Sequence, residues 1–308
     1  MMVKETKEWL VKTPWGNIAC LSWGDPQKPP MLMVHGYMDS AATFIPIVNL
    51  LPDDYFYLAF DLPGHGKSDP FPGGILVSQT HQVEAVRRVV EYFAWDTFLY
   101  MTHSVGFIIG VIYNCVWPFK ISKMINIDPG PPLSTYCFHE NNPMLWYQYQ
   151  YEHFYETTYS RLEIYRNKTY TYDQAIELLV KSRKLTKEQS AVVLSRTLIP
   201  QGDGMYRLSW EPTMKKLPSV YVTEDMLISI VTTNAPPMLN IVASIDDTIK
   251  PFKKIGARLI ERFKKSIPNF FLYNVIGHHD IHITNPDTFV DKIIDFLNTD
   301  FKNNKAKL

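Results

Sequence analysis

Short, wholly apolar runs that alternate with amphipathic helical patterns restrict the fold of this chain more than any other feature. Such runs occupy residues 31–34, 55–60, 97–101, 123–127, 238–243 and 269–275, and apolar residues at helical spacing lie in 82–93 and 288–297. A strand covered on both faces reads as a continuous apolar run, and strands that alternate with helices pair in parallel through crossovers. With a hairpin at 9–23 around Pro14-Trp15, the pattern predicts an α/β fold with a mostly parallel eight-stranded sheet and helices on both faces.

The alternation stops between residues 131 and 236. This segment holds a run rich in tyrosine and two helices with start signals, Thr171 followed by Gln174 and Thr186 followed by Gln189. A hydroxyl and an amide at this spacing satisfy the first-turn backbone of a helix. We therefore expect a helical cap (lid) domain over 131–236, inserted into a core domain formed by 1–130 and 237–308.

Composition excludes several classes of protein. The 31 basic side chains balance 31 acidic ones, so the chain lacks the positive field that a nucleic-acid binder needs. Its three cysteines are too few for a disulfide framework and lack the spacing of a zinc site. Charged residues in the first ten positions argue against a secretory signal, and no apolar run reaches the ~18 residues of a membrane span.

A serine stands at a turn between a predicted strand and a predicted helix, in Thr102-His103-Ser104-Val105-Gly106. This position resembles the nucleophile elbow, in which a sharp, strained turn exposes a serine hydroxyl. The usual pattern is Gly-x-Ser-x-Gly, and Thr102 replaces the first glycine. Taken alone, the segment is equally compatible with an ordinary strand–helix junction.

Two further segments follow neighbouring strands. In His35-Gly36-Tyr37, the glycine allows a turn that points the Tyr37 amide at the serine, so that it forms an oxyanion hole with the Val105 amide. The segment Asp61–Ser68 ends like a phosphate-binding loop, but Asp61 stands where that motif requires glycine. We interpret it as a structural turn held by hydrogen bonds from Asp61 and His65.

The remaining candidates lie near the end of the chain. Asp247 follows the run at 238–243, and His279 follows the run at 269–275. Serine, then aspartate, then histidine, each after a strand, is the chain order of one type of catalytic triad. A metal site at His278, His279 and His282 is the competing interpretation. We expect no metal there and no cofactor, because the cluster follows the last predicted strand in a loop and has Asp280 alone nearby.

Together these residues resemble the α/β-hydrolase superfamily, and within it the serine hydrolase-like family. The resemblance spans nearly the whole chain and is carried by His35-Gly36 with Asp39, the turn Asp61–Ser68, the serine turn, Gly277-x-His279-x-x-His282 with Pro286, and the cap segments 175–179 and 185–190. It implies an α/β-hydrolase fold with an inserted helical lid. By position it makes Ser104 the nucleophile, His279 the base and Asp247 the acid. Some lidded relatives instead take the acid from the strand before the lid, where this chain has Asp128.

These roles imply a serine hydrolase that cleaves a carboxylic ester or thioester through an acyl-enzyme. The expected partner is a small, apolar acyl substrate, with His35, Trp146, Tyr147 and Phe154 as candidates for binding it. The aromatic residues are equally candidates for the core of the lid. The alternatives are a non-catalytic small-molecule binding protein of the same fold, and cofactor-free chemistry that uses His279 as a base.

The last three residues, Ala306-Lys307-Leu308, are a conservative variant of the Ser-Lys-Leu peroxisomal address. They predict either import into the peroxisome, with its import receptor as a partner, or a cytoplasmic protein if the address is not read.

Overall fold

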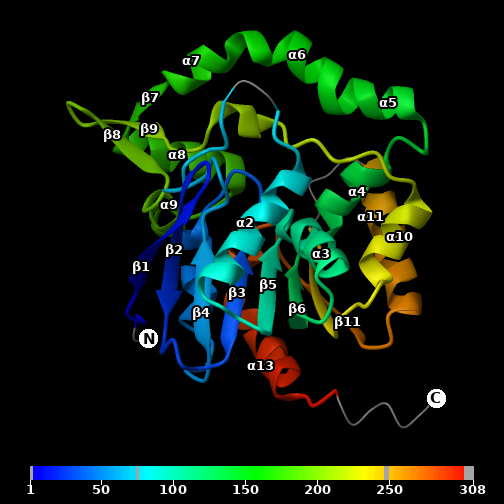
Figure 1. Ribbon diagram of the computed structural model, residues 1–308. Coiled ribbons are helices and arrows are strands. Elements are labelled where there is room, and N and C mark those ends of the chain that lie inside the picture. The colour runs from blue at the N-terminus through cyan, green and yellow to red at the C-terminus, as the bar shows by residue number, and fades with distance from the viewer. Residues whose placement is uncertain (1–2, 74–75, 246–249, 302–308) are drawn as a thin grey trace.

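The computed structural model describes residues 3–73, 76–245 and 250–301, and its centre is a sheet of eight strands (Figure 1). Asp247 and the terminal Ala306-Lys307-Leu308 lie outside the described residues. The strand order is β1-β2-β4-β3-β5-β6-β10-β11. The bounds are β1 Lys7–Thr13, β2 Gly16–Trp23, β3 Pro30–Val34, β4 Phe56–Phe60, β5 Phe98–His103, β6 Ile121–Ile127, β10 Met238–Ala243 and β11 Phe270–Val275.

The sheet is mostly parallel, as the alternation predicts. In the order of the sheet, β4, β3, β5, β6, β10 and β11 each pair with their neighbour in parallel. Strand β2 is antiparallel to both β1 and β4. The predicted hairpin is confirmed, with Thr13 opposite Gly16 across the Pro14-Trp15 turn. Each parallel strand ends at the same edge of the sheet, which places the segments that follow them side by side.

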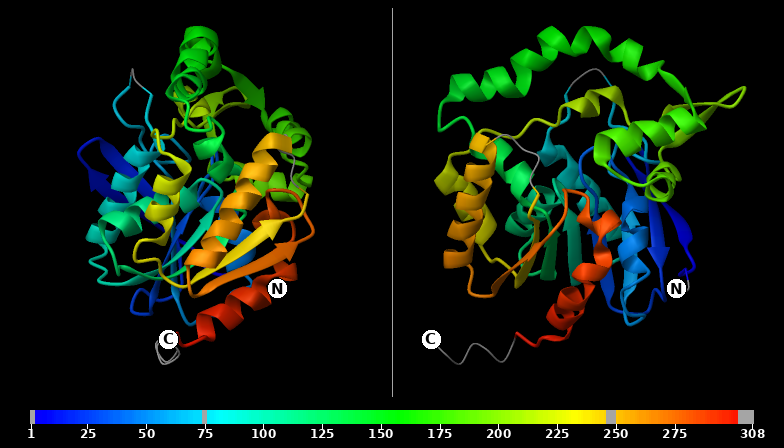
Figure 2. Two further views of the ribbon diagram at one scale, coloured as in Figure 1. Left: turned by 90° about the vertical axis from the view of Figure 1, so that its right-hand side faces the viewer. Right: turned by 180° about the vertical axis from the view of Figure 1, so that it is seen from behind.

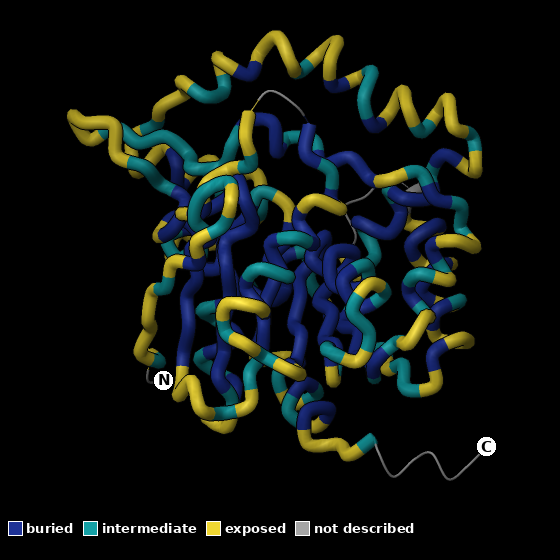
Figure 3. The backbone as a smooth tube through the Cα atoms, in the orientation of Figure 1, coloured by how far each residue is buried: buried dark blue, intermediate teal, exposed yellow. Residues whose placement is uncertain are grey.

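Helices cover both faces of the sheet, which explains why its central strands β3, β4 and β5 consist mostly of apolar residues. Helices α2 (Gln79–Tyr92), α3 (Gly106–Val116), α10 (Glu224–Thr232) and α11 (Lys250–Ser266) lie on one face, and α1 (Ile45–Val48), α12 (Ile281–Thr284) and α13 (Val290–Asn298) on the other (Figure 2). Alternate residues of β3 enter the two cores: Leu32 belongs to the same buried cluster as Phe107, and Met33 to the same cluster as Phe289. Figure 3 shows the central strands of the sheet in the dark blue that marks buried residues. Full burial of one such side chain contributes about 1.5–3 kcal/mol.

The segment between β6 and β10 begins with α4 (Gly130–Cys137) and ends with α10. Both helices pack against α11, and α10 also packs against α3, so they extend the helical layer beside the sheet. The residues between them, 138–223, arch over one edge of the sheet (Figure 1), and we call them the cap. The division of the chain into two domains at 131 and 236 stays a prediction.

The cap contains the two helices whose starts were predicted. Its elements are α5 (Pro143–Tyr147), the π-helix η2 (Gln148–Glu152), α6 (His153–Thr157), the 3-10 helix η3 (Tyr159–Arg161), α7 (Leu162–Arg166), β7 (Thr169–Thr171), α8 (Tyr172–Arg183), α9 (Lys187–Leu194), β8 (Leu198–Gly202), β9 (Met205–Leu208) and the 3-10 helix η4 (Pro212–Lys215). The hydroxyls of Thr171 and Thr186 each accept a hydrogen bond of 3.2 Å from the backbone amide three residues on, at Gln174 and Gln189. The side chains of those glutamines bind back to the threonine amides at 2.9 Å, so both capping boxes are confirmed.

The small antiparallel sheet β7-β9-β8 in the cap was not expected. Its β8–β9 turn contains Asp203 and Gly204, both with positive φ, which is the conformation that a tight hairpin requires. The Asp-Gly pair is the signal in the sequence that marks this hairpin. None of the helices in the described part of the chain has the length and hydropathy needed to cross a membrane.

Candidate active site

A cavity of about 1050 Å³ lies between the cap and the edge of the sheet where the parallel strands end. The predicted nucleophile, base and oxyanion-hole residues lie on its wall: Ser104, His279, Tyr37 and Val105. Tyr37 follows β3, Ser104 and Val105 follow β5, and His279 follows β11. The structure therefore brings together side chains and amides from three separate strand ends in one enclosed space.

Ser104 occupies a strained turn between β5 and α3. Its φ is +54°, a left-handed conformation that is uncommon for a residue with a Cβ. The Ser104 amide donates a 3.0 Å hydrogen bond to the Ile127 carbonyl, and its carbonyl accepts one of 3.0 Å from the Phe107 amide. These bonds to β6 and α3 hold the strained backbone, as a nucleophile elbow requires.

Thr102 takes the place of the first glycine of the elbow pattern without preventing the turn. It is the fifth residue of β5 and fully buried, with its side chain against Gly106. A Cβ added to Gly106 would lie 2.2 Å from the Thr102 hydroxyl oxygen and 2.5 Å from the Val34 carbonyl oxygen. The second glycine of the pattern is therefore essential for close packing, and the threonine occupies the space beside it.

The loop after β3 approaches the serine because residue 36 has no side chain. A Cβ on Gly36 would lie 2.7 Å from Nδ1 of His103 and 3.1 Å from the Cβ of Ser104. The preceding His35 holds this loop in place: its Nδ1 donates to the Gly36 carbonyl at 2.7 Å, and its Nε2 accepts from the Leu62 amide at 2.9 Å. Burial lowers the pKa of His35, so the ring stays neutral and keeps this donor–acceptor pattern.

The backbone amides of Tyr37 and Val105 have no hydrogen-bond acceptor among the described residues. Tyr37 is 44% exposed, and Val105 precedes the first turn of α3, where backbone N–H groups have no partner within the helix. Two unpaired donors on the wall that holds Ser104 are suited to bind an anionic oxygen.

His279 is hydrogen-bonded to Asp128, the residue that follows β6. The distance from Nδ1 of His279 to Oδ2 of Asp128 is 2.6 Å. The other carboxylate oxygen accepts from the Ala243 amide at 3.1 Å, and the Asp128 amide donates to the Ile241 carbonyl at 2.7 Å. Asp128 is thus fixed between β6 and β10. Because Asp128 binds Nδ1 of His279, Nε2 is the ring nitrogen that can act on a group in the cavity.

The pKa of His279 is raised by its surroundings. Burial alone would lower it, but the hydrogen bond and negative charge of Asp128 outweigh burial, so the pKa lies above the usual value. Asp247, which the family resemblance favours as the acid, lies outside the described residues. The carboxylate that the described part of the chain offers to His279 is Asp128.

A buried ion-pair cluster lies beside these groups and joins the cap to the core. Arg183, at the end of α8, binds Asp280 through Nε at 2.8 Å and through a terminal nitrogen at 2.6 Å, and binds Asp39 at 2.9 Å. Burial acts to raise the pKa of Asp280, but Arg183 outweighs it and holds that pKa below the usual value. Asp280 is the neighbour of His279 in the chain, so a cap residue binds the segment that carries the imidazole.

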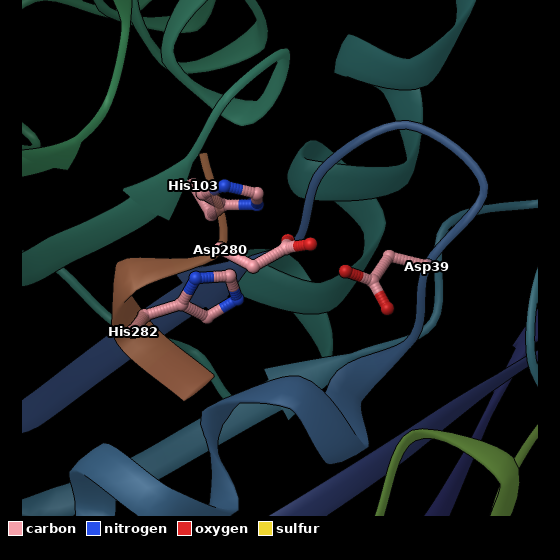
Figure 4. A group of neighbouring side chains, drawn as sticks. All are labelled: Asp39, His103, Asp280 and His282. Carbon is pink, nitrogen blue, oxygen red and sulfur yellow. The ribbon is translucent and has the colours of Figure 1, made fainter. Parts of the chain in front are cut away.

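Asp39, Asp280, His103 and His282 lie close together (Figure 4), with potential metal-ligating atoms within 4.8 Å of one another. Their carboxylates already bind the Arg183 guanidinium, so a metal ion would have to displace that cation. Burial lowers the pKa of both histidines, and brings that of His282 to about 3. Of the histidines considered in the sequence, this group contains His282 but neither His278 nor His279.

The turn at 61–68 has the structural role predicted for it. The Asp61 carboxylate accepts hydrogen bonds from the amides of Ala41 at 2.7 Å and Lys67 at 2.9 Å, and pairs with Arg196 of the cap at 2.8 Å. Nδ1 of His65 lies 3.2 Å from the Pro63 carbonyl oxygen. This turn is a second place where a buried arginine of the cap binds a carboxylate of the core.

The structure does not place the other predicted substrate-binding residues on the cavity wall. His35 is buried beneath the loop that it holds, and Phe154 packs in a small cap core with Leu76 and Leu162. Trp146 donates to the Ser219 carbonyl at 3.1 Å, and Tyr147 stacks on Tyr151. Sequence reasoning missed other cap residues that do line the cavity, among them Gln150, Arg183, Lys215 and Lys216.

Comparison with known proteins agrees with this fold. The family model described as alpha/beta hydrolase fold matches residues 29–284, which is most of the chain. The chain belongs to the α/β-hydrolase superfamily. Among curated relatives, the serine hydrolase-like protein of Danio rerio is 26% identical over 96% of this chain and 90% of its own length. Serine hydrolase-like protein 2 of Homo sapiens is 27% identical over 94% and 93%.

Solved structures of α/β-hydrolases share the architecture at lower identity. A thioesterase domain from the curacin biosynthetic pathway superposes with a TM-score of 0.72 at 17% identity, and the alignment covers 94% of this chain and 99% of that domain. The likeness extends over the cap as well as the sheet. The resemblance to the serine hydrolase-like family, drawn from motifs, is confirmed, and the fold and the names of the relatives support a hydrolase.

Proposed function

We propose that the chain is a serine hydrolase that cleaves a carboxylic ester or thioester, with Ser104 as nucleophile, His279 as base and Asp128 as the acid that orients it. The observation that carries the proposal is the 2.6 Å contact between His279 and Asp128 beside a cavity whose wall also holds Ser104 on a strained turn. A serine hydroxyl is a weak nucleophile until a neighbouring base accepts its proton.

In the first half of the reaction, the Ser104 oxygen attacks the acyl carbon while Nε2 of His279 accepts the hydroxyl proton. Asp128 holds the proton on Nδ1 and stabilises the imidazolium that forms. The carbonyl oxygen becomes an oxyanion and accepts hydrogen bonds from the amides of Tyr37 and Val105. Removing one such donor typically costs about 3–4 kcal/mol of transition-state stabilisation.

Collapse of this intermediate breaks the bond to the alcohol or thiol, which leaves with the proton from His279. In the second half, His279 deprotonates a water molecule that attacks the acyl-enzyme. The acid is then released and Ser104 regains its proton. Serine, rather than aspartate, at the elbow favours acyl substrates, because the intermediate is an ester of the substrate's own acyl group.

Labelling with a fluorophosphonate tests the proposal directly. We expect the folded parent to be labelled on Ser104, identified by mass spectrometry of the digested adduct, and the Ser104→Ala variant to remain unlabelled. The parent should also hydrolyse 4-nitrophenyl butyrate, and the variant should lose at least 10³-fold of that activity.

A folded parent that neither reacts with the probe nor hydrolyses short esters, beside a serine esterase that does both, would overturn the proposal in favour of a binding protein. Ester hydrolysis that survives in Ser104→Ala would instead favour chemistry that depends on His279 alone.

A further inference from the structure

The cavity wall is strongly positive although the chain as a whole is neutral. Besides Arg183, the cap contributes a set of cationic side chains to the wall: Arg166, Lys168, Lys184, Arg207, Lys215 and Lys216. The carboxylates on the described wall are Asp39 and Asp280, and both bind Arg183. An excess of positive charge therefore lies on the cap side of the cavity and faces the edge of the sheet that holds Ser104.

Several of these cations have no carboxylate partner. Arg166 is paired with Glu163 and Glu211, but in the described part of the chain Lys168, Arg207, Lys215 and Lys216 form no ion pair. An unpaired cation on a partly buried wall loses hydration without electrostatic compensation, and an anion in the cavity would supply that compensation.

Aromatic rings on the same wall hold two of the lysines in place. The Lys215 ammonium lies 4.0 Å from the ring centroid of Tyr165, and the Lys216 ammonium lies 3.8 Å from that of Tyr149. These contacts orient the ammonium groups without neutralising them. Burial lowers the pKa of Lys216 to about 8, so the group would gain from a nearby negative charge.

The fold gathers these cations from distant parts of the sequence. Arg207 on β9 is paired with Thr169 on β7, next to Lys168. Helix α7 packs against η4, which ends at Lys215 and is followed by Lys216. Figure 1 shows α7, β7 and β9 together at one side of the cap, and η4 packs against α7 there. The charge is thus concentrated at one place under the cap.

We infer that the substrate is an acyl ester or thioester carrying a carboxylate or phosphate group, and that Arg207, Lys215 and Lys216 bind this anion while the acyl carbon faces Ser104. The inference rests on the proposed function, which it extends to a substrate class. A cavity of about 1050 Å³ is at the upper end of small-molecule sites and exceeds the needs of a short neutral ester. The anion is either a carboxylate at the far end of the acyl chain or a phosphate on the leaving group.

Matched substrate pairs test the inference and separate the two sources of the anion. The first pair is 4-nitrophenyl valerate and mono-4-nitrophenyl glutarate, which differ by a carboxylate on the acyl chain. The second is S-butyryl-pantetheine and S-butyryl-4′-phosphopantetheine, which differ by a phosphate on the thiol. We expect kcat/KM to be at least tenfold higher for the anionic member of one pair, and this preference to shrink in 0.5 M NaCl because salt screens the attraction.

The double variant Lys215→Gln/Lys216→Gln ties the preference to the wall. We expect it to reduce the ratio of anionic to neutral kcat/KM at least tenfold. Lys187→Gln, at an exposed cap lysine on α9 outside the cavity wall, is the matched control and should leave the ratio within twofold of the parent. Equal or better hydrolysis of both neutral members by the parent, with Ser104 labelled by the fluorophosphonate, overturns the inference and leaves the proposed function standing.

If the parent hydrolyses none of the four substrates, the inference is tested by measuring the binding of anions to the cavity. Calorimetric titration with glutarate and with 4′-phosphopantetheine should then show binding of one of them that is weakened at least tenfold in Lys215→Gln/Lys216→Gln. Absence of binding by both, or binding that the double variant does not weaken, overturns the inference.

Discussion

Replacing Asp128 with asparagine removes the negative charge from the 2.6 Å contact with His279 and keeps the side-chain shape. During attack by Ser104 the imidazole becomes positive, and Asp128 is the carboxylate bound to it. Two unit charges ~4 Å apart attract by about 4 kcal/mol at an effective dielectric constant of ~20. The His279 side chain is 38% exposed, and solvent screens part of this attraction, so we expect a loss of ~2–3 kcal/mol.

That loss corresponds to roughly 10²-fold in kcat. A second effect adds to it, because an asparagine amide that donates to Nδ1 would leave the proton on Nε2, where His279 cannot accept the serine proton. In a serine protease the same exchange lowers kcat about 10⁴-fold. We therefore expect Asp128→Asn to lower kcat on 4-nitrophenyl butyrate by between ~10² and ~10⁴, with a small change in KM.

The pH profile gives an independent check. His279 must be neutral to act as a base, so activity rises as pH increases through its pKa. Because Asp128 raises that pKa, its loss should move the acidic limb of kcat/KM to lower pH. Asp247→Asn is the matched control, and we expect less than a threefold change. Full activity in Asp128→Asn together with loss of activity in Asp247→Asn, both variants being folded, would refute this reasoning.

Three further substitutions test the surroundings of the site. Arg183→Gln leaves two buried carboxylates without their cation and should lower the free energy of unfolding in urea by about 3–5 kcal/mol. Lys181→Gln, an exposed control on the same helix, should lower it by less than about 0.5 kcal/mol. Equal effects of the two substitutions would contradict the structural role of the Arg183 ion pairs. Gly36→Ala places a Cβ 2.7 Å from a ring nitrogen and should lower kcat on the order of 10²-fold by moving the Tyr37 amide, and an unchanged kcat would exclude that crowding. His282 has a folded-state pKa of about 3 and protonates more readily when unfolded, so stability should fall below pH ~6.5, by about 2 kcal/mol at pH 5. His282→Phe should abolish that part of the loss between pH 7 and pH 5 in urea unfolding, and an identical loss in parent and variant would show that His282 is not its source.

The core of the fold was predictable because its signals are local. The central parallel strands β3, β4 and β5 are buried on both faces, so their sequences are mostly apolar, and each start of α8 and α9 is encoded in four consecutive residues. The serine turn and the histidine loop follow predicted strands, and parallel strands end at one edge. That geometry was enough to predict that Ser104 and His279 would share a cavity wall.

Spacing in the sequence did not predict which carboxylate contacts His279. Asp128 follows β6 and Asp247 follows β10, and these two strands are neighbours in the sheet. The carboxyl ends of both strands are therefore at the same edge of the sheet, and the chain order Ser, Asp, His fits either aspartate. A contact of 2.6 Å distinguishes Asp128 only once side chains have coordinates.

The face of the cap that lines the cavity was also beyond sequence reasoning. The aromatic stretch passes through the π-helix Gln148–Glu152, which changes the helical phase, so a regular 3.6-residue period does not indicate which rings point inward. Tyr149 reaches the wall, whereas Tyr147 and Phe154 do not. The cationic cluster was hidden for a different reason, because it forms only when β7 pairs with β9 and α7 packs on η4.

Arg183 belongs to the cap, whereas both carboxylates that it binds belong to the core. Burial and the charge of Arg183 act to lower the pKa of His279, against the stronger opposite effect of Asp128. Any motion that lifted α8 away would hydrate the imidazole and leave Asp280 without its cation, and His279 would then keep its proton to a higher pH. With the cap open, His279 would already carry a proton and could not accept one from Ser104, whereas with the cap closed it would be neutral at the same pH. The position of the cap thus sets the pH range in which His279 can act as a base.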